Sequence, residues 1–149
     1  MYEKRQEMIN FEIHKKDIGL SNELHDSYKQ LVRKKDCYQN IYRLTTNEHI
    51  AFKKNFRIAY GYILSVETVE WDFYVRHCFF INDKGMVIDP TLPYADHDQY
   101  YVVESYSFTE YINAICSNRE TSLSGYKPLA DKEMEFIMWA YTHNIACLS

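Results

Sequence analysis

The chain has 149 residues, of which 46% are hydrophobic and 26% charged, and its formal net charge is −4. This length and apolar content predict one globular domain over residues 1–149 with a sizeable core, and they exclude a disordered chain. General binding of nucleic acid needs clustered positive charge. The basic clusters at 33–35 and 53–54 are short and better explained as solvated helix ends, so no nucleic-acid partner is expected.

The apolar runs are only a few residues long, so no segment is predicted to span a membrane. Residues 1–7 are charged and lack the apolar core of a signal peptide. We therefore expect a cytoplasmic protein, from a bacterium or a phage that infects one. None of the four cysteines belongs to a CxxC pair, which excludes zinc-ribbon and thioredoxin-like sites and predicts free thiols.

The first part of the chain is predicted to be helical. A first helix is expected over residues 2–16 and is broken by Gly19. Ser21 then resembles an N-cap, and a second helix follows. A third helix is expected to begin at Asp36, with its apolar residues at helical spacing on one face: Cys37, Ile41 and Leu44.

The middle of the chain has the alternation and β-branched content of strands. Strands are expected over residues 56–66, 71–82, 86–89 and 100–106, with a turn at 82–85 and a polar loop at 92–99. Gly61 inside the first strand indicates a bulge or a close approach of another backbone.

The last part is again predicted to be helical. Ser107 and Glu110 have the spacing of a capping box, which opens a helix through about Cys116. A loop follows at 118–125, and a last helix begins at about Ala130. Its apolar stripe is expected to face the core: Met134, Ile137, Met138, Tyr141 and Ile145. Helices, then an antiparallel meander, then helices predict an α+β fold.

Three residues on successive elements carry the chemistry of a thiol nucleophile: Cys37, His77 and Asp89. A cysteine, a histidine base and a carboxylate that orients the base form a catalytic triad if they meet in space. Each residue alone has an ordinary structural explanation, the cysteine as a buried thiol and the histidine as a satisfied core residue. The combination is what favours catalysis.

The turn between the two strands decides whether His77 and Asp89 share a face. With a four-residue loop and no bulge, the Asp89 side chain would lie on the same face of the hairpin as Cys78, opposite to the face that carries His77. The turn sequence Asn-Asp-Lys-Gly instead favours a type I turn with Gly85 in the left-handed conformation, which forms a G1 bulge. The bulge shifts the register by one residue. Phe79 then lies opposite Asp89, and His77 becomes its diagonal neighbour on the same face.

The position of Cys37 at a helix start adds an electrostatic argument. The partial positive charge of the first turn favours the thiolate, and the N–H of Cys37 is positioned to donate to an oxyanion. We expect Asp36 to point at the helix amides as a cap. Asn40 or Gln39 is expected to orient the site, to contact substrate or to complete the oxyanion hole.

This set of motifs resembles the papain-like and transglutaminase-like cysteine enzymes, in particular small bacterial and phage members of that superfamily. The motifs are Cys37-Tyr-Gln-Asn40, Gly61-Tyr62, His77-Cys-Phe79 and Asp89-Pro-Thr91, and they cover roughly residues 36–106. The aromatic residue after the histidine is often Trp in those proteins and is Phe79 here. The resemblance implies a Cys-bearing helix packed on an antiparallel β-meander, with Cys37 as nucleophile, His77 as base and acid, and Asp89 as orienter.

Two functions follow as alternatives. The first is a cysteine hydrolase or acyl transferase acting on a protein or peptide through a thioester, without a cofactor or metal. Protease, amidase, deamidase and transglutaminase share its first steps. The second is a non-catalytic protein-binding module, such as a phage-encoded inhibitor of a host protein, favoured by the 14 tyrosines and 2 tryptophans. A metal site at 96–98 is disfavoured, because three adjacent residues rarely point at one ion.

Overall fold

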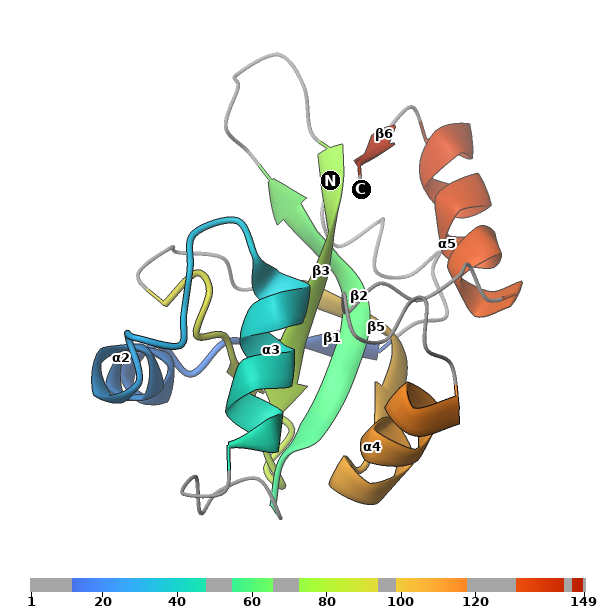
Figure 1. Ribbon diagram of the computed structural model, residues 1–149. Helices are drawn as coiled ribbons and strands as arrows, with labels where there is room; N and C mark the ends of the chain where they lie inside the picture. The colour runs from blue at the N-terminus through green and yellow to red at the C-terminus, as the bar shows by residue number, and fades with distance from the viewer. Residues whose placement is uncertain are drawn as a thin grey trace.

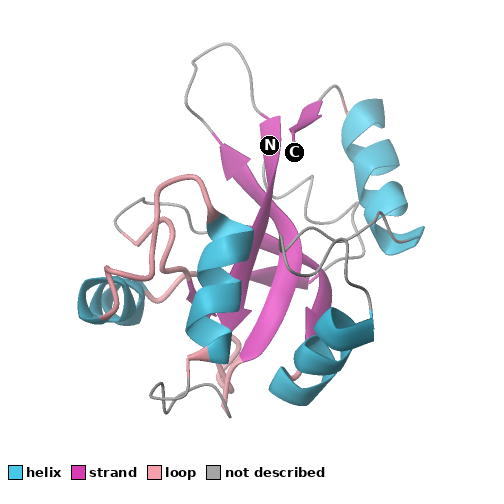
Figure 2. Ribbon diagram, viewed as in Figure 1, coloured by secondary structure: helices cyan, strands magenta, loops and turns pink. Residues whose placement is uncertain are grey.

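The computed structural model describes residues 12–47, 55–65, 73–93, 99–117, 131–143 and 146–148. Within them, four helices cover a mostly antiparallel sheet, and the predicted α+β class is confirmed (Figures 1 and 2). The helices are α2 (Ile18–Ser27), α3 (Cys37–Thr46), α4 (Phe108–Ser117) and α5 (Asp131–Thr142). The strands are β1 (Glu12–His14), β2 (Arg57–Ser65), β3 (Phe73–Ile81), β4 (Val87–Ile88), β5 (Tyr100–Tyr106) and β6 (Ala146–Leu148).

The sheet has the strand order β1-β5-β2-β3-β4, and each of these neighbouring pairs is antiparallel. β2, β3 and β4 form the predicted meander, while β5 returns to the far side of β2. The short strand β6 pairs in parallel with the start of β3, and nothing in the sequence pattern predicted it.

The two edges of this sheet are joined by one short segment. β1 pairs with β5 at one edge, and the chain then continues to Lys16, which bridges Val87 at the other edge. The Asp17 N–H donates to the Val87 carbonyl at 2.8 Å, and the Val87 N–H donates to the Lys15 carbonyl at 2.8 Å. The sheet therefore curls on itself, and its inner face is lined by buried side chains from four strands: Ala59, Ile63, Phe79, Ile81, Val87, Tyr100 and Val102.

The outer face of the sheet is covered by helices. α3 lies in front of β3 in Figure 1, whereas α4 and α5 lie toward the right of the view; α4 contacts β2 and β5, and α5 contacts β5 and β6. One core cluster joins α2, α3 and α4 to the sheet and contains Leu24, Ile41, Leu44, Phe80 and Tyr111 among others. A second cluster lies under α5, where Phe136 stacks on Tyr62 with ring centroids 4.6 Å apart.

The N-terminal predictions need correction. Residues 12–14 are a strand rather than the end of a helix, because their backbone pairs with β5; residues 1–11 lie outside the described part of the chain. Asp17, not Ser21, caps α2, since its Oδ1 accepts the Leu20 N–H at 3.0 Å. Gly19 lies inside α2 and does not break it.

The stripe predicted to face the core on the last helix is only partly correct: Ile137 packs against the core, but Met134 is exposed. Ile145 lies outside the described residues. Phe136 and Ala140 are fully buried on α5, whereas Met138 and Tyr141 are 57% and 77% exposed. The three central strands match the prediction closely. Gly61 lies at a register shift between β2 and β5, and a Cβ there would meet the Tyr101 carbonyl oxygen at 1.8 Å, so both expectations for this glycine are confirmed. The predicted loop at 118–125 lies outside the described residues.

Among the residues described, no helix has the length and apolarity needed to cross a membrane.

Candidate active site

The hairpin between β3 and β4 has the predicted bulge. Phe80 pairs with Ile88, and Gly85 has a φ of +76°. The Gly85 N–H donates to the Asn82 carbonyl at 3.1 Å, and the Asn82 N–H donates to the Met86 carbonyl at 3.0 Å. This geometry is a type I turn followed by a G1 bulge. Its register places residue 89 opposite residue 79.

His77 and Asp89 therefore lie on the same, inner face of the curled sheet. The His77 Nε2–H donates to Asp89 Oδ2 at 2.8 Å. Both side chains are buried, with 4% and 0% of their surface exposed. The contact that the hairpin parity predicted is present.

Cys37 is the first residue of α3 and is half-buried. Cys37 is among the groups that raise the pKa of His77, which places its side chain beside the imidazole. Because Asp89 occupies Nε2 of the ring, Nδ1 is the nitrogen that remains for the thiol. The three predicted triad residues are thus brought together in the order Cys37–His77–Asp89.

The approach of α3 to His77 follows from the pairing of β3. Along one edge of β3, β6 pairs with residues 73–75 and β4 with residues 80–81. Within the described residues, no strand pairs with positions 76–79 on that edge. α3 packs on β3, and its N-terminus can therefore bring Cys37 to His77.

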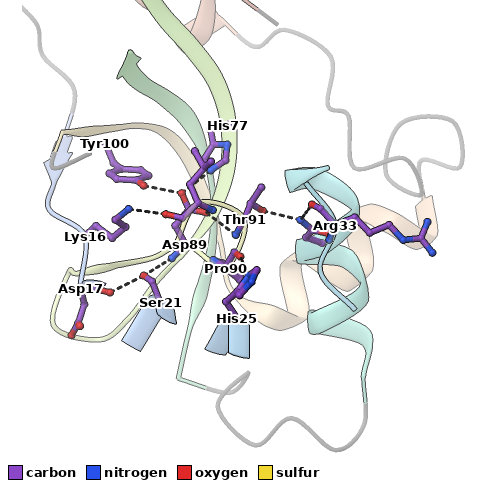
Figure 3. Close-up of polar contacts among 12 residues, drawn as sticks. Lys16, Asp17, Ser21, His25, Arg33, His77, Asp89, Pro90, Thr91 and Tyr100 are labelled. Carbon is purple, nitrogen blue, oxygen red and sulfur yellow. Dashed lines mark hydrogen bonds and ion pairs between the residues drawn. The ribbon is translucent and has the colours of Figure 1, made fainter. Parts of the chain in front are cut away.

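Besides His77, several other groups hydrogen-bond to Asp89 (Figure 3). Its Oδ2 also accepts the Tyr100 hydroxyl at 2.7 Å. Its Oδ1 accepts the backbone N–H groups of Thr91 at 3.1 Å and Leu92 at 3.2 Å. Its own N–H donates to Ser21 Oγ at 2.9 Å. Both carboxylate oxygens are therefore fixed, which sets the plane of the group and the direction of the His77 ring.

Sequence reasoning missed Tyr100 and Ser21. Ser21 was interpreted as a helix cap, but its hydroxyl donates to the Asp17 carbonyl at 2.7 Å and accepts the Asp89 N–H. Tyr100 was recognised only as a strand residue. A hydroxyl on β5 that reaches a carboxylate just after β4, with two strands between them in the sheet, leaves no local sequence signal.

His77 and Asp89 each stabilise the charged form of the other. Burial lowers the pKa of His77, but the negative charges of Asp89 and Cys37 and the hydrogen bonds from both outweigh it and raise that pKa to about 10. Burial raises the pKa of Asp89, but the charge and hydrogen bond of His77 and the hydroxyl of Tyr100 hold it below its usual value. These two pKa shifts imply that His77 and Asp89 form an imidazolium–carboxylate pair at neutral pH.

Asn40 is placed to orient the site rather than to donate to an oxyanion. It is fully buried, and its Nδ2 donates to the Arg33 carbonyl at 2.8 Å and to Thr91 Oγ1 at 3.0 Å. Its Oδ1 accepts the Arg33 N–H at 2.8 Å and Arg43 Nη2 at 2.7 Å. Because both amide protons are engaged, the expectation of an oxyanion donor gives way to a scaffold role that ties α3 to the segment after Asp89. Gln39 is half-buried, and its predicted role stays a prediction.

Asp36 does not cap α3 as expected. Its carboxylate accepts Arg43 Nη2 at 3.0 Å, and it makes no capping hydrogen bond to the helix amides. The positive end of the helix dipole is thus not neutralised by this carboxylate.

The other cysteines have different surroundings. Cys78 is 1% exposed, and burial together with the charges of Cys37 and Asp89 raises the pKa of its thiol. Cys116 is exposed on α4. In the described part of the chain, no group of three or more His, Cys, Asp or Glu side chains is placed to hold a metal ion; residues 96–98 lie outside it.

Comparisons with protein-family models, with curated proteins and with solved structures found no match for this chain.

Proposed function

We propose that this protein is a cysteine-dependent hydrolase or acyl transferase with Cys37 as nucleophile, His77 as base and acid, and Asp89 as orienter. The observation that carries the proposal is the buried His77–Asp89 hydrogen bond of 2.8 Å beside a cysteine at a helix start. The same arrangement supports the resemblance to the papain-like and transglutaminase-like enzymes. The proposed substrate is an acyl or carboxamide group of a protein or peptide.

The reaction begins with attack of the Cys37 thiolate on the carbonyl carbon, which forms a tetrahedral intermediate. His77 then gives its Nδ1 proton to the leaving amine as the C–N bond breaks, and a thioester on Cys37 remains. Water or a second amine attacks the thioester carbon while it gives a proton to Nδ1, and the C–S bond then breaks to release the Cys37 thiolate. Thiolate and imidazolium return together, so no proton is gained or lost over the cycle.

The negative charge that develops on the carbonyl oxygen in the tetrahedral intermediate needs a hydrogen-bond donor. The backbone N–H of Cys37 is in the first turn of α3, where amides have no carbonyl partner within the helix. Asp36 leaves that turn uncapped by pairing with Arg43. Protease, amidase, deamidase and transglutaminase reactions all use these steps, and they differ only in the acyl donor and in the nucleophile that resolves the thioester.

Selective alkylation of Cys37 tests the proposal. We expect iodoacetamide at pH 6 to modify Cys37 at least about tenfold faster than the exposed Cys116, because only Cys37 has an imidazolium partner at a helix start. The sites are read by mass spectrometry of the folded protein. Cys116→Ala is the matched control and should leave the rate at Cys37 unchanged, whereas His77→Gln should reduce that rate to the level of Cys116.

A Cys37 that reacts more slowly than Cys116, or equally fast in His77→Gln, would contradict the proposal. The non-catalytic binding module would then be the better explanation of the chain.

A further inference from the structure

Tyr100 reaches Asp89 across the inner face of the curled sheet. β5 and β4 are separated in the sheet by β2 and β3, yet the Tyr100 hydroxyl donates to Asp89 Oδ2 at 2.7 Å. This is the oxygen that also accepts His77 Nε2–H. The Tyr100 side chain is fully buried and packs edge-on against Phe79 with ring centroids 4.9 Å apart, so the hydroxyl is fixed in place (Figure 3).

Two donors on one oxygen compete for the same negative charge. A hydroxyl that donates to Oδ2 withdraws charge from it and weakens the attraction of that oxygen for the imidazolium. It also stabilises the carboxylate most when the imidazole is neutral, since no cation then shares the charge. Both effects make loss of the imidazolium proton easier.

We propose that Tyr100 is a positioning residue that sets the charge balance of the His77–Asp89 pair, and through it the pH range in which Cys37 is reactive. The proposal rests on the proposed function of Cys37. Tyr100 donates to Asp89, and its ring lies 6.4 Å from the His77 ring, centroid to centroid. It acts on Cys37 through this pair.

Several other groups lie around the pair, among them the buried Cys78 thiol of β3, whose pKa is raised by burial and by the charges of Cys37 and Asp89. From α2, Ser21 accepts the Asp89 N–H but does not contact its carboxylate. The Thr91 and Leu92 amides hold the other oxygen, Oδ1. The buried Lys16 ammonium donates to the Leu92 carbonyl at 2.7 Å, and from α2 the His25 ring donates to the Pro90 carbonyl at 2.8 Å.

From α3, Cys37 faces the imidazole. In the described part of the chain, the side chains of Tyr100 and His77 are the ones that hydrogen-bond to the Asp89 carboxylate.

The test is the pH dependence of Cys37 alkylation by iodoacetamide, followed by mass spectrometry between pH 4 and pH 11 on the full chain. In Tyr100→Phe we expect both limbs of the rate profile to move to higher pH by at least about 0.5 units. Tyr101→Phe is the matched control: this tyrosine is equally buried on the same strand but packs against Phe136 on the opposite face. Its profile should match that of the wild type.

A second variant gives the opposite sign and guards against poor folding of Tyr100→Phe. Site-specific 3-fluorotyrosine at position 100 is a stronger donor of the same shape, so both limbs should move to lower pH. Unmoved limbs, or a shift of the same sign in both variants, would overturn the inference and leave Tyr100 a structural residue only.

Failure of the proposed function gives a different result from failure of the Tyr100 inference. If Cys37 shows no selective alkylation, the function is wrong, and the effect of Tyr100 is then measured on the His77 ring itself by NMR titration of the same variants. The His77 titration should still move up in Tyr100→Phe and down with 3-fluorotyrosine.

Discussion

At the scale of single residues, Asp89 is the centre of the site. Four donors converge on its carboxylate, from His77, Tyr100 and the two amides of the following turn. A buried ion is tolerated only when it is paired and its lone pairs are satisfied, because desolvation alone costs several kcal/mol. Full satisfaction of Asp89 explains how a charged pair persists inside a small domain.

The pH dependence of folding should report this pair. The pKa of His77 is raised from 6.5 to about 10, so its stabilising contribution is complete below pH 6.5 and is lost as the pH rises through about 10. The pKa of Asp89 is lowered from 3.8, so its contribution is present above that value and is lost as the pH falls below it.

We therefore expect the free energy of unfolding, measured with urea, to fall between pH 6.5 and pH 10 in the wild type. The His77→Gln variant should be less stable at pH 6 and should show a flatter alkaline slope. Equal slopes in the two proteins would show that the pair does not titrate as described.

The residue scale also shows what sequence could and could not predict. Cys37, His77 and Asp89 could be selected because their side chains carry nucleophile, base and carboxylate chemistry in a recognisable order. For Asn40 the sequence left several roles open, because its position shows only that it lies one turn after Cys37. Its real partners, at Arg33 and Thr91, depend on how a turn and a distant segment fold around it.

At the scale of elements, the β3–β4 hairpin was predictable and α5 was not. Gly85 defines a turn type, and the turn type defines the register, so local sequence was sufficient. The face of α5 depends instead on which side chains fit the sheet. Glu133 can be buried there because it pairs with Arg76. Arg76 lies 57 residues earlier in the chain, and the periodicity of a helix cannot reveal such a distant partner.

Two glycines should respond very differently to alanine. At Gly61, a Cβ would collide with the Tyr101 carbonyl oxygen at 1.8 Å, so Gly61→Ala must force β2 and β5 apart and should cost about 3 kcal/mol or more. At Gly85 the nearest atom, of His14, is 3.7 Å away. Gly85→Ala should therefore cost only the left-handed backbone strain of about 1–2 kcal/mol.

Urea unfolding of the two variants compares these costs directly. The order is the informative result: a Gly85→Ala protein less stable than Gly61→Ala would contradict the close approach of β2 and β5.

At the scale of the whole molecule, α5 is fastened to the sheet by a buried ion pair. Arg76 Nε lies 2.6 Å from Glu133 Oε1, and its Nη2 donates to Oε2 at 2.9 Å. The Tyr62 hydroxyl also donates to Oε1 at 2.8 Å. The residue next to His77 therefore anchors the C-terminal helix, and the outer face of β3 is fixed while its inner face carries the site.

A double-mutant cycle should expose this anchor. Glu133→Leu alone leaves the Arg76 charge buried and should cost about 3–5 kcal/mol of unfolding free energy. Arg76→Met with Glu133→Leu replaces both charges by apolar groups and should recover most of that loss. Additive costs in the double variant, measured by urea unfolding, would show that the two side chains do not act as a pair.

The partners of Asp89 also determine when the site can exist during synthesis. Ser21 precedes Asp89 by 68 residues, and Tyr100 follows it by 11. A growing chain on the ribosome exposes Cys37 early, when it is an ordinary thiol without an imidazolium beside it. The Asp89 carboxylate cannot be enclosed until β5 has left the exit tunnel. Under the proposed function, Cys37 therefore gains its imidazolium partner only after nearly the whole sheet is present.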